Sequence, residues 1–313
     1  MLAKNNFTHA LMFHHFHDDK HPVSQGSLSG EQFEMILDWT AENFNLIDAQ
    51  QYLEKLRVKN LLPTDVCITF DDALLCQAEI AAPILKKKNL QAFFFIHSAP
   101  FFGNPNPLEI YRYFRNTCFP EVDDFYRSFF ERAKYWFPAL FEKSEQTFDP
   151  DEYLSAYGFY SRNDKWFRYL RDTGLGESVY DEAMTRLMAE NEFDPKAISQ
   201  KLWMSETNVK DLSAHGHVIG LHSFSHPAMM HLMDAKKQTL EFSRNREHLM
   251  GLTANKIVSM AHPFGNYSDE TLRILRSLDI EIGFRDNCSV KSIASKLEVP
   301  REDSSNVLLQ ISR

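Results

Sequence analysis

Short apolar runs alternate with amphipathic segments over the first hundred residues. The runs read as strands, because they suit a sheet that is buried on both faces: His9–Phe16, Val66–Phe70 and Ala92–Ile96. The segments between them have helical spacing: Gln32–Asn43, Asp48–Asn60 and Ala78–Lys88. Ser29 and Gln32 have the spacing of a capping box at the start of the first helix. This alternation predicts a parallel sheet covered by helices on its outside.

The same alternation returns after Gly216. Three further strands are predicted over Val218–Leu221, Ile257–Ala261 and Glu281–Phe284. Helices are predicted between them over Asp234–Met250 and Ser268–Leu278. We therefore assign residues 1–103 and 201–313 to one α/β domain.

Residues 104–200 break this alternation. The segment has few β-like runs and is dense in aromatic residues at helical spacing, as in Phe125–Phe130 and Tyr135–Phe137. We predict a mostly helical insertion that emerges near the active site. Its aromatic residues either form a small core of their own or provide a sugar-stacking or membrane-facing surface.

Two motifs follow predicted strands and carry the groups for metal chemistry. Thr69–Asp72 ends with two carboxylates, and His222–His226 begins and ends with an imidazole. Alone, an Asp-Asp pair can be a helix N-cap, and a His-x-x-x-His spacing is not specific. Together they supply a carboxylate and two imidazoles for Zn²⁺ or a similar ion, with open positions for water and one carboxylate to spare. The sequence therefore predicts a metal-dependent hydrolase.

These motifs resemble those of the polysaccharide deacetylases, which carry the NodB homology domain (carbohydrate esterase family 4). Thr-Phe-Asp71-Asp72 and His222-Ser-Phe-Ser-His226-Pro match the first two family motifs, and Ala261–Gly265 is similar to the third, usually Arg-x-Pro-Tyr-Gly. The resemblance implies a distorted (β/α) barrel of about seven strands.

The resemblance also implies roles for particular residues. Asp71 would be the catalytic base, while Asp72, His222 and His226 would bind the metal. The backbone N–H of Phe264 would help to bind the oxyanion.

The chain departs from the family pattern in its general acid. The late Leu-x-His motif is missing near the C-terminus, but Leu11–His15 in the first predicted strand resembles a permuted branch of the family. His14 is then the expected acid. His15 is the alternative, because neighbouring strand residues point to opposite faces. His262, within the third motif, is a second alternative.

The second departure is the Arg of the third motif, which in the family pairs with the base. Ala261 stands in its place. Arg285 and Arg301 are the possible replacements, and we favour Arg301 because Pro300-Arg301 resembles an element near the end of permuted relatives.

Composition narrows the class of protein. The 313 residues are 43% hydrophobic, enough for a sizeable core. A net charge of −9 and the lack of a basic tract beyond Lys86–Lys88 argue against nucleic-acid binding. We see no signal peptide and no run of about 18 apolar residues that could span a bilayer. The four cysteines include no Cys-x-x-Cys pair and suit a reducing compartment, so we expect a cytoplasmic protein.

The resemblance implies a metal-dependent N-deacetylase. Its expected substrate is an N-acetylated amino sugar of a surface glycan or of a nucleotide- or lipid-linked precursor. A deformylase or carbohydrate esterase on the same scaffold is one alternative. A catalytically silent glycan-binding protein is another, although pure binding needs no spare base beside a metal.

Overall fold

The computed structural model describes residues 7–154, 160–289 and 293–312. The chain divides into two compact units. The first combines Met1–Asn106 with Lys201–Arg313, and the second is Pro107–Gln200.

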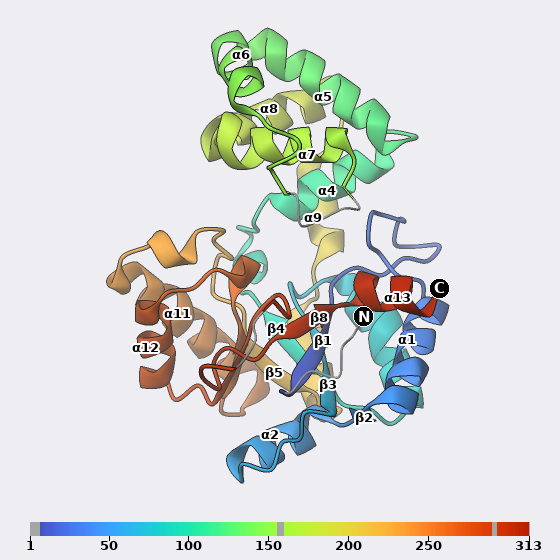
Figure 1. Ribbon diagram of the computed structural model, residues 1–313, viewed down its shortest axis with the longest axis vertical. Coiled ribbons are helices and arrows are strands. Elements are labelled where there is room, and N and C mark those ends of the chain that lie inside the picture. The colour runs from blue at the N-terminus through green and yellow to red at the C-terminus, as the bar shows by residue number, and fades with distance from the viewer. Residues whose placement is uncertain (1–6, 155–159, 290–292, 313) are drawn as a thin grey trace. The chain divides into compact units, whose positions relative to one another are not determined.

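The first unit is built around a parallel sheet whose strands follow the order β7-β6-β5-β4-β3-β1-β8 (Figure 1). These strands are β1 (His9–Phe13), β3 (Asp65–Phe70), β4 (Phe93–Ile96), β5 (Val218–Leu221), β6 (Ser259–Ala261), β7 (Ile282–Phe284) and β8 (Arg301–Asp303). The short β2 (Asn45–Leu46) pairs with β3 outside this path. A parallel bridge between Phe284 and Val299, just before β8, brings the two ends of the sheet together. The predicted distorted (β/α) barrel of about seven strands is thus confirmed.

Helices alternate with these strands. They are α1 (Gly30–Asn43), α2 (Ala49–Arg57), α3 (Ala82–Lys87), α10 (Glu206–Ala214), α11 (Ala235–Thr253), α12 (Asp269–Ser277) and α13 (Ser304–Ile311). Shorter turns of helix are the π-helix Gln77–Ala81 and the 3₁₀ segments Ala99–Phe102, Met230–Leu232 and Pro263–Gly265. The predicted capping box is present, because the Ser29 hydroxyl accepts from Gln32 N–H and the Gln32 side chain accepts from Ser29 N–H.

Four predicted strands are shorter than the sequence indicated, and β8 was not predicted at all. The strand predicted over His9–Phe16 ends at Phe13. β8 has the sequence Arg-Glu-Asp, which lacks the apolar pattern of a strand. It joins the sheet because Ala10 of β1 pairs in register with Arg301, a contact between opposite ends of the chain.

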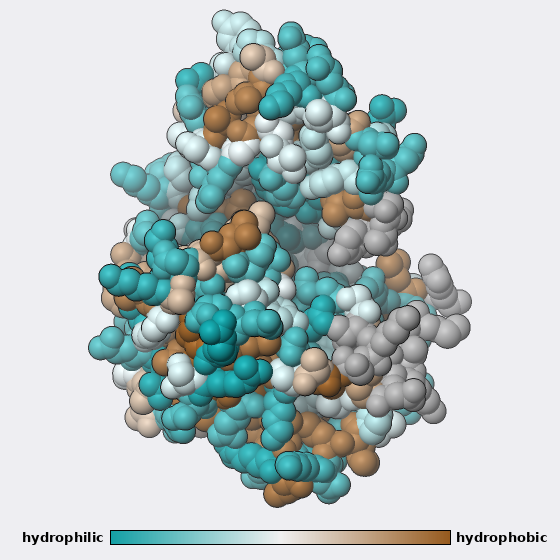
Figure 2. Space-filling model, turned by 60° about the vertical axis from the view of Figure 1, so that its left-hand side comes forward, coloured by the Kyte–Doolittle hydropathy of each residue, from teal (hydrophilic) through white to brown (hydrophobic). Residues whose placement is uncertain are grey.

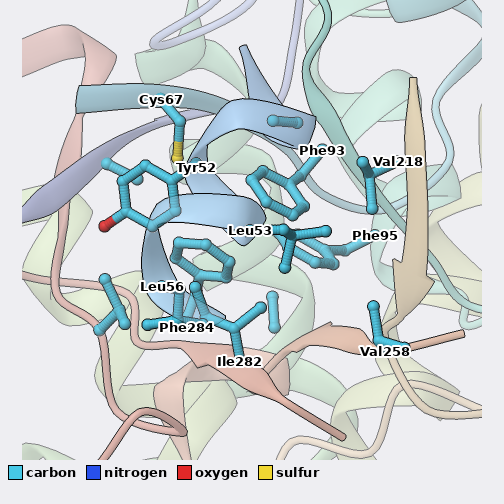
Figure 3. Packing of buried hydrophobic residues seen from close by; sticks show 14 of the residues in the cluster. Tyr52, Leu53, Leu56, Cys67, Phe93, Phe95, Val218, Val258, Ile282 and Phe284 are labelled. Carbon is cyan, nitrogen blue, oxygen red and sulfur yellow. The ribbon is translucent and has the colours of Figure 1, made fainter. Parts of the chain in front are cut away.

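Apolar side chains fill the interior of the barrel at the end where α2 lies. Tyr52, Leu53 and Leu56 of α2 pack against Phe93 and Phe95 of β4 (Figure 3). Because the N–H of Ala49 donates to the carbonyl of Gln91, just before β4, α2 begins beside the N-terminal ends of the strands. Each large side chain buried here contributes about 1.5–3 kcal/mol.

Helices make up the regular structure among the described residues of the second unit. It contains α4 (Leu108–Thr117), α5 (Val122–Trp136), α6 (Pro138–Thr147), α7 (Arg162–Tyr169), the π-helix Leu170–Gly174, α8 (Glu177–Glu190) and most of α9 (Pro195–Leu202). Phe125 and Phe129 of α5 are fully buried, and their rings lie 5.2 and 5.1 Å from that of Phe167. These buried aromatic residues therefore form a core within this unit, whereas Tyr135 is 77% exposed.

Hydrophobic residues occur in separate groups among hydrophilic ones on the face shown in Figure 2. Among the helices of the described residues, none has both the length and the apolar character needed to cross a bilayer.

Candidate active site

The site lies where the apolar interior of the barrel ends. Side chains two positions apart along a strand share a face, so the inward-facing series Phe93, Phe95 continues to His97, and Cys67 leads through Thr69 to Asp71. The same alternation brings His222 inward after Val218. Parallel strands end at one rim, so these polar side chains gather at the carboxyl ends of the sheet.

Asp72, His222 and His226 converge on one point. Asp72 Oδ1 lies 3.2 Å from His222 Nε2 and 3.3 Å from His226 Nε2, and the two nitrogens are 3.1 Å apart. Ligand atoms at the corners of a tetrahedron around a zinc ion are about 3.4 Å apart. Asp72 Oδ1 is buried and makes no well-formed hydrogen bond to another described residue. This arrangement of lone pairs fits a divalent cation.

The electrostatics of the three groups agree with that fit. Burial opposes the charge on Asp72, but His226 and His222 outweigh it and hold the pKa of this carboxyl well below its ordinary value. The Nδ1 of His222 lies 2.9 Å from the carbonyl oxygen of Ala261. A proton on Nδ1 would donate there and leave Nε2 as the ligand atom, as is usual for metal-binding histidines.

Asp71 is the second carboxylate of the first motif and is held by Arg301. The guanidinium donates from Nη1 to Oδ1 at 2.7 Å and from Nη2 to Oδ2 at 2.6 Å. Asp71 is 2% and Arg301 1% exposed. Burial opposes ionisation, but Arg301 and the nearby His222 outweigh it and lower the pKa of Asp71. Arg285, the other arginine considered, lies near the ring of Tyr267 instead.

His14 faces both carboxylates. Its Nε2 lies 3.7 Å from Asp71 Oδ2 and 3.8 Å from Asp72 Oδ2, and its side chain is 29% exposed. The sequence predicted that His14 and His15 lie in a strand and point to opposite faces. This is wrong, because β1 ends at Phe13. Their rings are nearly parallel, with centroids 6.1 Å apart.

His262 does not face this group. Its Nε2 lies 2.8 Å from the carbonyl oxygen of Leu297, and its ring stacks on Tyr267. Burial lowers the pKa of His262 to about 4. Of the three histidines considered for the acid, the structure places His14 beside the carboxylates and His262 away from them.

Phe264 adopts a left-handed backbone conformation with φ of 53°. Its ring centroid is 4.7 Å from that of His226, and the residue is 43% exposed. The hydrogen bonds of its 3₁₀ turn come from the N–H groups of Gly265 and Asn266. The turn therefore does not use the Phe264 N–H.

Three residues near the site escaped the sequence analysis. His97 is 2% exposed, and its ring lies 5.3 Å from that of His226. The alternation Phe93, Phe95, His97 could have revealed it. Glu241 and Asn245 of α11 bind the backbone of residues 222–225, and no pattern in the sequence pointed to that contact.

Comparisons with known proteins agree with the motifs. The family model for "Polysaccharide deacetylase" matches residues 180–283, a range that contains the His222–His226 motif. None of the curated proteins matches this chain. The family resemblance indicated by the motifs is confirmed.

Solved structures show the same fold over nearly the whole chain. The Streptococcus pyogenes deacetylase PplD, solved in complex with acetate, is 17% identical, with a TM-score of 0.55 and 98% of each chain covered. IcaB from Ammonifex degensii is 15% identical, with a TM-score of 0.57, over 99% of this chain and 98% of that one. A de-N-acetylase from Aggregatibacter actinomycetemcomitans is 12% identical, with a TM-score of 0.54, over 97% and 99%.

Proposed function

We propose that this chain, which carries the homology domain of the polysaccharide deacetylases, is a metal-dependent hydrolase that removes the N-acetyl group from an amino sugar. The observation that carries the proposal is a buried carboxylate, Asp71, beside a convergent Asp72, His222 and His226 set. The set suits Zn²⁺, which accepts one carboxylate oxygen and two imidazole nitrogens and retains an open position.

The chemistry follows from the groups around the site. An amide resists hydrolysis because its carbonyl is a weak electrophile and its leaving amine is basic. A zinc ion, when bound, would polarise the acetyl carbonyl and lower the pKa of a coordinated water toward about 7. Every remaining step depends on the chain's own residues.

Asp71 would accept the proton of the attacking water. Arg301 uses one donor on each oxygen of this carboxylate, and each oxygen has a second lone pair to receive a proton. Arg301 also keeps Asp71 ionised at neutral pH, so the base is ready in the resting state. The guanidinium thus orients the carboxylate without blocking it.

Two groups would complete the reaction. The Phe264 N–H would donate to the oxyanion as negative charge develops on it. His14 would pass a proton to the departing amine, since its Nε2 lies beside both carboxylates and its side chain is partly exposed.

The substrate proposed is an N-acetylated amino sugar of a surface glycan or of a nucleotide- or lipid-linked precursor. The cytoplasmic location expected from the sequence favours the precursors. The helical unit at Pro107–Gln200 would influence substrate choice, because the chain leaves the barrel for it after β4 and returns before β5. Those two strands lead to His97 and His222.

The test is release of acetate by the metal-loaded protein from acetylated sugar nucleotides and oligosaccharides. N-formyl and O-acetyl analogues in the same assay distinguish a deformylase or an esterase. Asp71→Asn should keep the metal but lose about 10²–10⁴ in turnover, the usual contribution of a general base. His222→Ala should lose metal and activity together, while Asp279→Asn, an exposed site, serves as the control. Near-normal turnover of Asp71→Asn on the best substrate would show that Asp71 is not the base.

A further inference from the structure

One face of α11 is polar where it meets the loop that carries the two histidine ligands. Glu241, Asn245 and His248 lie at positions i, i+4 and i+7 of this helix, so they share a face. All three side chains bind the segments that directly follow β4 and β5.

Glu241 binds the middle of the loop. Its Oε2 accepts from the N–H groups of Phe224 at 3.0 Å and Ser225 at 2.8 Å. Its Oε1 accepts from the Ser225 hydroxyl at 2.8 Å. Among the ion pairs of the described residues, none involves Glu241. The Glu241 carboxylate therefore accepts three hydrogen bonds, all from this loop.

Asn245 binds the start of the same loop. It is fully buried, and its Oδ1 accepts from the N–H of His222 at 3.1 Å. Its amide nitrogen donates to the carbonyl of Ile96 at 2.9 Å and to the Ser98 hydroxyl at 2.7 Å. One side chain thus joins the end of β4 to the first histidine of the motif.

The loop needs such external support. Ser223 and His226 have φ of 63° and 57°, a left-handed conformation that non-glycine residues adopt reluctantly. Within the loop, the N–H of His226 donates to the Ser223 hydroxyl at 3.1 Å. Strained backbone of this kind persists where the surrounding structure holds it, and Glu241 and Asn245 supply four further bonds.

We infer that Glu241 and Asn245 are positioning residues that set the separation of the His222 and His226 imidazoles for the metal. Neither side chain belongs to the convergent ligand set, so each acts through the backbone of the loop. The inference rests on the proposed metal-dependent function, and it concerns the strength and geometry of binding rather than the reaction itself.

The test measures metal binding in the absence of substrate. Co²⁺ is titrated into the metal-free protein, with the visible spectrum reporting coordination geometry and competition with a chelator reporting affinity. Glu241→Ala should weaken binding about 10–100-fold, the range usual for groups that orient metal ligands, and should alter the spectrum. Glu241→Gln should fall between this variant and the wild type, because its amide oxygen can still accept from the two loop N–H groups but the negative charge of the carboxylate is lost. Glu247→Gln, an exposed site on the same helix, should leave both quantities unchanged.

Folding is controlled separately. Ser225→Ala removes only the hydroxyl bond to Glu241 and should weaken metal binding by about 2–5-fold even if the Glu241 variants fail to fold. Thermal unfolding of each metal-free variant separates a loss of fold from a loss of metal affinity.

Two outcomes have distinct meanings. If the wild type binds no Co²⁺, or binds it only at a site that remains in His222→Ala, the proposed function fails. If the wild type binds there, but Glu241→Ala and Ser225→Ala bind with unchanged affinity and spectrum, the positioning role is wrong while the metal site stands.

Discussion

The ion pair between Arg301 and Asp71 provides the sharpest test of how this site is built. Arg301→Met keeps an unbranched side chain, shorter than that of Arg, and removes two bonds to Asp71, one to Thr69 and one to the Arg285 carbonyl. The Asp71 carboxylate would then be buried without its cation. Breaking a buried pair by removing one partner costs about 3–5 kcal/mol.

The chain contains a matched control for this change. Arg57 forms an ion pair with Glu281 at 2.8 Å, but the side chains are 48% and 34% exposed. Exposed pairs contribute about 0–1 kcal/mol, so Arg57→Met should be nearly neutral. Asp71→Leu combined with Arg301→Met should recover much of the loss, because a buried pair replaced by apolar groups is often close to neutral.

The assay is hydrogen exchange of metal-free protein, followed by mass spectrometry of peptides from β1 and β3. These peptides report the free energy of unfolding of the barrel separately from that of the helical unit. Acidification supplies a second signature. Without Arg301, burial would raise the pKa of Asp71 above its unfolded value of about 3.9. The loss of stability should therefore shrink as the pH falls through the raised folded pKa.

Two results would refute this reasoning. One is a cost for Arg301→Met no larger than that for Arg57→Met. The other is a large cost that does not change with pH, which would mean that the lost packing of the side chain, rather than an unpaired carboxylate, destabilises the variant.

Three further predictions follow from the same geometry. His14→Ala should leave Co²⁺ affinity unchanged but lower turnover about 10²–10⁴-fold if His14 is the acid, and lost metal binding would instead make it a ligand. In metal-free protein, burial lowers the pKa of His222 but its carboxylate neighbours raise it more, to a net value above the ordinary 6.5. The stability that protonated His222 contributes is thus present below about pH 6.5 and is lost as the pH rises through the folded pKa. Metal-loaded protein should instead gain stability over that range, because the metal binds neutral imidazole. Thermal unfolding from pH 6 to 8.5, with and without metal, distinguishes the two cases. Gly265→Ala should lower the melting temperature more than Gly103→Ala, because both have positive φ but only at Gly265 would the added carbon overlap the Asp286 carboxylate; equal effects would mean that Asp286 moves aside freely.

Much of this protein can be predicted from local patterns. The apolar runs of β3, β4 and β5 predict buried parallel strands, because each run is short and is followed by a helix with its own periodicity. The motifs Thr69–Asp72 and His222–His226 predict the metal ligands from residue type and spacing, since both follow such strands. The motif also pointed to His14, but the sequence did not show that β1 ends before this residue.

Other features depend on contacts between distant parts of the chain. Arg301 lies 2.6 Å from Asp71 because β8 pairs with β1 and β1 with β3, and the sequence near Arg301 shows no strand pattern of its own. Glu241 resembles any polar residue of an amphipathic helix until α11 packs against the loop after β5. Sequence periodicity determines which residues face the interior of the barrel, but the closing of the sheet decides which of them meet, because that depends on strand order and register.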